Sequence, residues 1–417
     1  MRTARVQLAG WGRGWNKEPK ARYIMRGRPT QKLPHNINVA KNLLAIAMAN
    51  LALTCRLPWW SGFSLALVLP VSVLIFLLSG PHGIASALLW TLPVWLLIAA
   101  DHWAPSELRP VPRTAPRWFF DGILYGLAAL QLINLIVLGM MVSRLHWTGT
   151  LDAVTALTNL LAMRILVGTN VCCAVIAPAH ELMHSRSHWQ RWLGRLLLMT
   201  VCYDHFFVAH RLGHHARLGS QEDPSTAETH ESYEEFFRRS LRRQWQIAWQ
   251  RQPRSLARGL ILECALMAFY LMAFGGLAAF MLGYVNLVAV RLLEAVNYFQ
   301  HFGLTLVRGQ SRVTAWRCDS AVSLFLFLGL TRHADHHRHP AKTYPELVDS
   351  PNGPHLPLGY LGMAIWVKND SKGYRKWALR GLAASKPQPG MDGDGEPGLS
   401  AISDLLPPLS SDGAPIA

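Results

Sequence analysis

The residues best suited to chemistry are nine histidines in four short segments. His180–His184 and His210–His215 each contain histidines four residues apart, and His333–His337 contains a pair three residues apart. Residues at these spacings share a helix face, so each pair can grip one metal ion. The fourth segment supplies the single His301. The nine candidate ligands are His180, His184, His210, His214, His215, His301, His333, His336 and His337.

The number of imidazoles predicts two metal ions, because one ion takes about four to six ligands. Imidazole binds Zn, Cu, Fe and Ni alike, so the spacing leaves the metal open. Acidic and amide side chains nearby could balance the metal charge or orient the rings through their second N–H. Glu294 and Asn297 precede His301 by seven and four residues and can share its helix face. The candidates for these roles are Glu181, Asp335, Glu294 and Asn297.

The elements that must position these segments are six apolar runs. Each is long enough to cross a bilayer, whose core needs about 20 residues per helix. The chain has 417 residues, of which 51% are hydrophobic and only 16% charged. We therefore expect an all-α, polytopic membrane protein instead of a soluble protein with buried helices. A shorter run, Leu43–Cys55, predicts an interfacial or half-membrane helix. The predicted spans are Phe63–Gly80, Ile84–Trp103, Phe119–Val142, Val154–Ile176, Gly259–Leu277 and Ala278–Val296.

The basic residues predict the orientation of these spans. Lys and Arg outnumber Asp and Glu by 41 to 25, and ten of the basic residues lie in residues 1–41. The loop 178–258 is also rich in arginine, so the positive-inside rule places this loop, both termini and the histidine segments in the cytoplasm. We expect a disordered basic tail over 1–41, a membrane domain over 42–380 and a disordered tail over 385–417. Because the basic residues lie in the tail and in the loops that orient the spans, the positive net charge does not indicate nucleic acid as a partner.

Two further charged features stand outside the histidine segments. Arg164 falls within the fourth apolar run together with two asparagines, and we expect it to be buried and paired between helices. Four arginines within residues 238–243 recur at helical spacing and are followed by Trp245 and Trp249. Such a helix is typical of a segment lying on anionic lipid headgroups, with a plain solvated face as the alternative.

The four segments resemble those of the integral-membrane alkane 1-monooxygenases, relatives of the xylene monooxygenases and, more distantly, of the membrane fatty-acid desaturases. The ordered pattern HExxH, HxxxHH, NYxxHxG and RHxDHH is met at every histidine. Glu222-Asp223-Pro224 and the stretch Pro354–Tyr360 are also similar to that family. The resemblance extends from about Trp95 to Lys376, which is most of the predicted membrane domain.

The resemblance implies a non-haem di-iron site held by the nine histidines. Such a site would use O2 to hydroxylate a terminal C–H bond of an apolar substrate, converting an n-alkane to a 1-alkanol. Electrons would come from rubredoxin and its NADH-dependent reductase, as separate proteins, because the chain has no CxxC pair. The hydrocarbon would enter from the membrane lipid, and the protein would lie in the inner membrane of a bacterium.

Two departures from the family pattern leave the substrate open. Ala209 and Gln300 each precede a box histidine where the alkane enzymes usually have Glu. Both residues are more similar to the xylene-type enzymes, so an aromatic methyl group or a terpenoid is an alternative substrate. An intramembrane zinc protease with Glu181 as general base would leave seven histidines unexplained. A desaturase and a metal transporter are further alternatives that fit the motifs less well.

Overall fold

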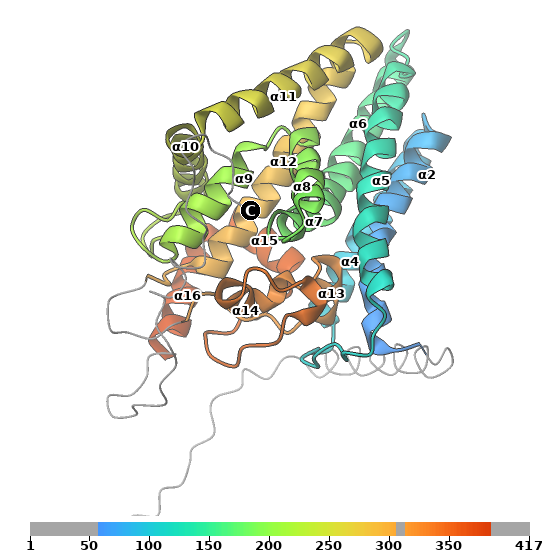
Figure 1. Ribbon diagram of the computed structural model, residues 1–417. Coiled ribbons are helices and arrows are strands. Elements are labelled where there is room, and N and C mark those ends of the chain that lie inside the picture. Colours follow the sequence, from blue (N-terminus) through green and yellow to red (C-terminus); the bar gives the residue numbers. More distant parts are fainter. Residues whose placement is uncertain (1–56, 306–312, 385–417) are drawn as a thin grey trace, which may run out of the picture.

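The structure is a computed structural model that describes residues 57–305 and 313–384. The predicted tails 1–41 and 385–417 and the predicted helix Leu43–Cys55 lie outside the described residues. Within the described residues the chain is all-helical, with two isolated β-bridges and no strand, which confirms the predicted fold class (Figure 1). The described part therefore owes its shape to helix packing.

Six helical segments of the described chain are long and apolar enough to cross a membrane, as predicted. α11 and α12 form a tight hairpin through Gly275, whose φ of 88° favours glycine. Figure 1 shows α5, α6, α11 and α12 extending toward one end of the molecule. The segments are Trp59–Ser79 (η1 Trp59–Leu67, α2 Val68–Ser79), Ile84–Trp103 (α3 Ile84–Leu89, α4 Leu92–Trp103), α5 Arg117–Ser143, Thr150–Met183 (α6 Thr150–Val171, η2 Cys172–Ile176, α7 Ala177–Met183), α11 Pro253–Phe274 and α12 Gly276–His301.

The fourth span is longer than its apolar run predicted, because the helical rod continues past Ile176 to Met183. His180 therefore lies on the same helical segment that crosses the membrane. The fourth span is also the most enclosed, with 72% of its apolar window buried against 22% for α11. The first candidate ligand is therefore anchored to the centre of the helix bundle.

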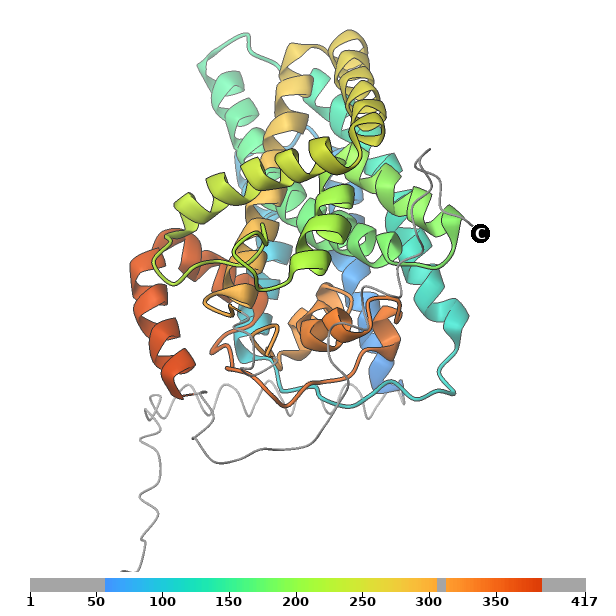
Figure 2. The same cartoon turned by 60° about the vertical axis from the view of Figure 1, so that its left-hand side comes forward.

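The remaining helices are short and gather around one end of the spans, where the histidines lie (Figure 1). Figure 2 shows α10, in yellow-green, lying across the direction of the spans. These helices are α8 His188–Thr200, α9 His205–Ala209, η3 His210–His214, η4 His215–Arg217, α10 Tyr233–Arg251, α13 Ala321–Leu326, η5 Leu330–Arg332, α14 His333–Arg338, η6 Tyr344–Glu346, α15 Tyr360–Asn369 and α16 Ser371–Ala384.

A buried aspartate ties the second span to two of the short helices. The Asp101 carboxylate accepts hydrogen bonds of 2.6 Å from the hydroxyls of both Ser320 and Ser323, and one of 3.0 Å from the Leu361 N–H. A Cβ on Gly359 would lie 2.0 Å from the Asp101 carboxylate, so this approach requires glycine. These contacts fix α13 and α15 against the membrane helices.

A buried ion pair holds α8 and α9 together. The Arg195 guanidinium donates to both carboxylate oxygens of Asp204, at 2.6 and 2.7 Å. Asp204 in turn donates its backbone N–H to Glu263 of α11 at 2.8 Å. Because paired charges in low dielectric hold a fixed geometry, this cluster positions the start of the segment that bears His210.

The polar residues of the fourth span lie differently from the prediction. Asn159, one of the two asparagines of this run, is buried and exchanges hydrogen bonds with the backbone N–H and carbonyl of His82, at 3.0 and 2.7 Å. Arg164 is exposed, although we expected it to be buried. Its Nε nevertheless bridges two helices, since it donates to the Tyr284 hydroxyl of α12 at 2.9 Å. The helix turns this longest side chain outward and buries the shorter amides.

Helix α10 divides its arginines between two faces. Arg239 is half-buried and paired with Glu231, and Arg243 donates to the backbone carbonyl of Gln221. Arg238 and Arg242 are exposed on the same stripe as Trp245 and Trp249. Only half of the predicted basic surface therefore faces outward.

Candidate metal centre

The structure brings all nine predicted histidines together in two groups. Within each group, one candidate ligand atom from every residue lies within 4.8 Å of the others. The rings come from α7 and the residue after it, from η3 and η4, from the end of α12 and from α14. The first group contains His180, His184, His210, His215 and His336, and the second contains His214, His301, His333 and His337.

The spacing of His210 and His214 predicted that both would bind the same metal ion. The structure instead places them in different groups. The turn His210–His214 is π-helical, and a π-turn bonds each residue to the fifth one along. His210 is therefore aligned with His215, and their Nε2 atoms lie 3.0 Å apart. His214 points to the second group instead, where its Nε2 lies 3.3 Å from that of His337.

The helix α14 is divided in the same way. His333 and His336, three residues apart, belong to different groups. His333 is joined in the second group by His337, four residues along. His336 reaches the first group, with its Nε2 3.3 Å from Nε2 of His215. This short helix lies between the two groups and serves both.

Six of the nine rings have pKa values that favour the neutral form, which metal binding requires. Burial, followed by repulsion from neighbouring imidazoles, holds the pKa values of His184, His210 and His336 well below their usual range, as it does for three others. Neutral rings offer lone pairs to a metal. The remaining rings with this shift are His215, His333 and His337.

Several buried ring nitrogens have no hydrogen-bond partner among the described residues. Orphaned polar atoms in a protein interior are costly and call for a bound partner. Five imidazoles in one group and four in the other are a donor set that suits a metal ion in each, so the residues present fit two metal ions. The orphaned atoms are Nε2 of His180, Nε2 of His184, Nε2 of His301, Nδ1 of His333 and Nδ1 of His337.

One carboxylate orients a ring of the second group. Oδ1 of Asp223 lies 2.9 Å from Nδ1 of His214. Asp223 also accepts hydrogen bonds from the Gly219 and Ser225 N–H groups at 3.0 and 2.8 Å, and from the Thr226 hydroxyl at 2.7 Å. Burial alone would raise the pKa of Asp223, but His214, His301 and the Ser225 N–H hold it below its usual value. Asp223 stays ionised and leaves Nε2 of His214 free toward the metal position.

Sequence reasoning gave Asp223 no role, although the Glu-Asp-Pro motif that contains it was noted. A second ring, that of His301, is oriented by a backbone group, with its Nδ1 2.9 Å from the Thr314 carbonyl oxygen. A backbone acceptor leaves no trace in the sequence. The second group is thus supported by one carboxylate and one carbonyl.

The four predicted orienting residues bind other groups in the described structure. The Glu181 carboxylate accepts the Tyr344 N–H at 2.9 Å. Asp335 pairs with the Lys342 ammonium at 3.0 Å and accepts the Val348 N–H at 3.0 Å. These bonds fasten α7 and α14 to the loop that follows α14.

Glu294 and Asn297 lie in a polar cluster apart from the histidine rings. Glu294 is fully buried and accepts hydrogen bonds from Tyr203 at 2.7 Å, Ser240 at 2.8 Å and Gln244 at 2.9 Å. The Asn297 amide donates to the same carboxylate at 3.2 Å. The cluster joins the turn before α9 to α10 and α12, so these two residues position helices and not rings.

Gln300, one departure from the family pattern, supports the helix that carries His333. Its amide donates to the Leu330 carbonyl at 3.1 Å and to the Tyr360 hydroxyl. Tyr360 donates to the same carbonyl at 3.0 Å. Ala209, the other departure, is fully buried in α9. Neither residue lies in a histidine group.

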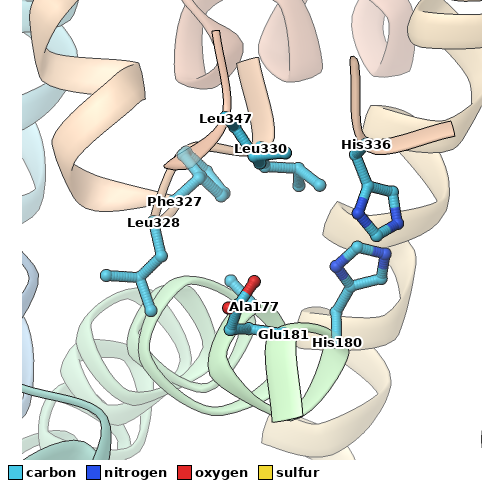
Figure 3. A pocket seen from close by; sticks show the side chains of 8 residues that line it. All are labelled: Ala177, His180, Glu181, Phe327, Leu328, Leu330, His336 and Leu347. Atoms are coloured by element: carbon cyan, nitrogen blue, oxygen red, sulfur yellow. The ribbon is translucent and has the colours of Figure 1, made fainter. Parts of the chain in front are cut away.

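A small hollow of about 10 Å³ opens beside the first group. Figure 3 shows the rings of His180 and His336 together at one end, the apolar side chains at the other and the Glu181 carboxyl between them. Apolar lining with a few polar groups is typical of a site for a small apolar molecule. The lining residues are Ala177, His180, Glu181, Phe327, Leu328, Leu330, His336 and Leu347.

Comparison with known proteins agrees with the motifs. Residues 155–349 match the fatty acid desaturase family. Alkane 1-monooxygenase 1 of Alcanivorax borkumensis is 28% identical over 324 residues, which cover 71% of this chain and 78% of that protein. Alkane 1-monooxygenase 2 of Pseudomonas aeruginosa is 29% identical over 294 residues, covering 64% and 75%. Alkane 1-monooxygenase 1 of the same organism is 31% identical over 221 residues, covering 48% and 58%.

The motifs, the clustered histidines and these similarities agree on one family. Every histidine of the four boxes lies in one of the two groups, at the end of membrane-spanning helices. The described fold has the helices of a multi-pass membrane protein. These findings support the alkane monooxygenase family for this chain, and with it an oxidoreductase of the monooxygenase type.

Proposed function

We propose that the protein is a di-iron monooxygenase that hydroxylates a terminal C–H bond of an apolar substrate, from n-alkane to 1-alkanol. The observation that carries this proposal is the pair of histidine groups beside an apolar hollow, at the end of membrane helices. The names of the relatives, alkane 1-monooxygenases, support the substrate class.

The five histidines of the first group would hold one iron and the four of the second group the other. When bound, the two irons supply the redox chemistry that activates O2. The net reaction takes one O2, two electrons and two protons, and yields the alcohol and one water. Asp223 holds the ring of His214 in the tautomer that leaves Nε2 available.

The apolar lining of the hollow beside the first group suits the end of an alkyl chain, and the hollow must widen to admit one. Phe327, Leu328 and Leu330 provide apolar contacts, and the rings of His180 and His336 close the opposite end (Figure 3). An apolar wall binds a hydrocarbon through the hydrophobic effect and keeps water from the reacting centre. The chain end would thus be presented to the metal of the first group. We expect the hydrocarbon to enter from the bilayer.

The electron donor proposed for this site is rubredoxin, with its NADH-dependent reductase. The basic loop 178–258 supports a cytoplasmic position for the histidine side, in the inner membrane of a bacterium. Basic residues on that side would attract an acidic donor and raise its association rate.

Metal analysis of the purified full-length protein tests this function. We expect about two irons per chain, and hydroxylation of octane or hexadecane when rubredoxin and its reductase are added. One zinc and no iron would instead support the zinc protease alternative. Turnover of xylene or a terpene, and of no alkane, would instead support an aromatic methyl group or a terpenoid as the substrate, the alternative suggested by Ala209 and Gln300.

A further inference from the structure

A continuous row of aromatic rings leads from the surface of the protein to a histidine of the first group. The row begins at Trp245 of α10, a residue that is 37% exposed, and ends at His210. The three residues between these ends, His205, Tyr203 and Phe206, are buried. They lie in α9 and in the turn before it, and α9 packs beside α10 (Figure 1).

Neighbouring rings of this row are in contact. The Trp245 and His205 rings are stacked, with their centres 4.2 Å apart, and the Tyr203 ring centre lies 4.8 Å from that of His205. The Phe206 ring is stacked on Tyr203 at 5.0 Å, and its centre lies 4.9 Å from that of His210. Separations of this order are typical of packed aromatic pairs. Because electron tunnelling weakens steeply with distance, rings in contact form a favourable path for electrons.

His205 takes part in this row only as an aromatic ring. Neither of its ring nitrogens has a hydrogen-bond partner among the described residues, and it belongs to neither histidine group. Burial lowers its pKa to about 3, so the ring is neutral at neutral pH. A neutral ring does not repel a positive charge that forms on the indole of Trp245.

Tyr203 is in contact with a base that can take its proton. The Tyr203 hydroxyl lies 2.7 Å from a carboxylate oxygen of Glu294 and 2.9 Å from Oε1 of Gln244. The carboxylate is the nearer and the charged acceptor, and it is fully buried. Its hydrogen-bond donors within the described chain are all neutral groups. A phenol gives up an electron more readily when its proton can pass to a base at the same time.

We propose that Tyr203 and Trp245 carry oxidising equivalents from the metal centre to the protein surface when no substrate is bound. The inference rests on the proposed function. Oxidation of an unactivated C–H bond requires a strong oxidant, and such an oxidant attacks nearby side chains if no substrate consumes it. A row of rings that ends at the surface provides another outlet.

The electrons and protons of this route balance in three steps. Tyr203 gives one electron through the Phe206 and His210 rings to the oxidised centre, and its O–H proton passes to Glu294. Trp245 then gives one electron through the intervening imidazole to the Tyr203 radical, which takes its proton back from Glu294. A thiol in solution reduces the Trp245 radical cation by one electron and releases one proton.

The surface around Trp245 allows such a reductant to reach it. Arg238 and Arg242 are exposed on the same stripe of α10. A basic helix surface that bears tryptophan lies at the level of the headgroups or in water, and not in the hydrocarbon core.

Photo-oxidation of the full-length protein from its surface tests the row. A ruthenium photo-oxidant is attached at Arg242→Cys, three residues before Trp245, in a Cys264→Ser background that removes an exposed cysteine. After a flash in the presence of an electron acceptor, electron paramagnetic resonance should detect a tyrosyl radical. The signal should be lost in Tyr203→Phe and in Trp245→Phe. Trp249→Phe, one turn further along the same exposed stripe, is the matched control and should keep it.

Glu294→Gln distinguishes the route from a merely structural role of Tyr203. The amide retains an oxygen for hydrogen bonds but cannot take up a proton, so the tyrosyl signal should be lost although the phenol is present. A signal that is unchanged in Tyr203→Phe and Trp245→Phe would overturn the proposal. This experiment needs no metal, O2 or alkane, so its result does not depend on the proposed function.

Peptide mapping by mass spectrometry tests the protective use of the row. Protein supplied with O2, rubredoxin and its reductase, but with no substrate, should gain oxygen on side chains near the first group several-fold faster in Trp245→Phe than in wild type or Trp249→Phe. Saturating substrate should remove this difference. Equal oxidation of all three proteins without substrate, in preparations that hydroxylate an alkane, would overturn the proposal. Failure of the proposed function would appear instead as the absence of both iron and hydroxylation, with the radical result unchanged.

Discussion

The two histidine groups differ in how firmly their rings are held. All four rings of the second group are buried, and two of them are oriented by Asp223 and by the Thr314 carbonyl. In the first group the residues His184 and His215 are only half-buried, and a hollow opens beside His180 and His336. The first group is the larger and the more accessible, and the second is the more rigid.

This difference separates two tasks of a metal centre. A metal position enclosed by its ligands resembles structural sites, whereas a position with an open side can take a reactant. We therefore expect substrate and O2 to approach the first group, while the second group holds its metal with the least freedom. Substitutions that act on one group alone can test this division.

The largest effect should come from removing one ligand in each group. His336→Ala and His214→Ala should each lower the metal content from about two ions to about one, and hydroxylation by more than about 100-fold. The protein should remain folded in the membrane, because the helices carry most of the packing. His230→Ala, an exposed histidine outside both groups, is the matched control. If either variant kept two metals and full turnover, its histidine would not be a ligand.

A smaller effect should follow from Asp223→Asn, which acts on the second group only. An amide cannot accept from His214, Gly219 and Ser225 together, so at least one of these donors loses its partner. We expect the second metal to be lost to a chelator about 10- to 100-fold more readily, with the first metal unaffected. Asp370→Asn, on an exposed aspartate, serves as the control.

Combining Asp223→Asn with His336→Ala then distinguishes the groups. If Asp223 supports only the second group, the double variant should keep no metal after the chelator challenge. If the double variant retained one ion, the division of the nine histidines into two separate metal positions would be wrong.

The smallest effect should come from Gln300→Glu, which restores the residue usual in the alkane enzymes. The new oxygen would face the Leu330 carbonyl, so the carboxyl must take up a proton or lose this bond. We expect a cost of about 1–3 kcal/mol, seen as a lower unfolding midpoint, with both metals kept. The exposed Gln246→Glu is the control. A lost metal would mean that Gln300 positions a ring directly.

The spans and the set of clustered histidines were predictable because both depend on local sequence. A run of about 20 apolar residues is long enough to cross a bilayer whatever surrounds it. The partition of the histidines was not predictable, since an i, i+4 rule assumes an α-helix and the chain forms a π-turn at His210–His214. Asp223 was missed because a loop, and not a helical period, brings it to His214.

The exposure of Arg164 illustrates a further limit. An arginine within an apolar run is consistent with either a helix interface or the lipid surface, and the sequence does not say which side of the helix faces its neighbours. In the structure Gly168 packs against Val288 of α12, while Arg164, one turn earlier, reaches only the Tyr284 hydroxyl at the edge of that interface. Burial of this residue depended on packing that only the fold defines.

The π-turn also makes the length of one segment part of the metal chemistry. A π-turn holds one residue more per turn than an α-helix, so deleting one residue between His210 and His215 would restore an ordinary helix. His215 would then follow His210 by four residues, which share an α-helical face, so these two rings would stay in one group. Without a deletion, an ordinary helix over the same residues would align His214 with His210 and turn His215 away by roughly 100°. The extra residue of the π-turn is therefore what lets the three histidines of one short segment serve both groups.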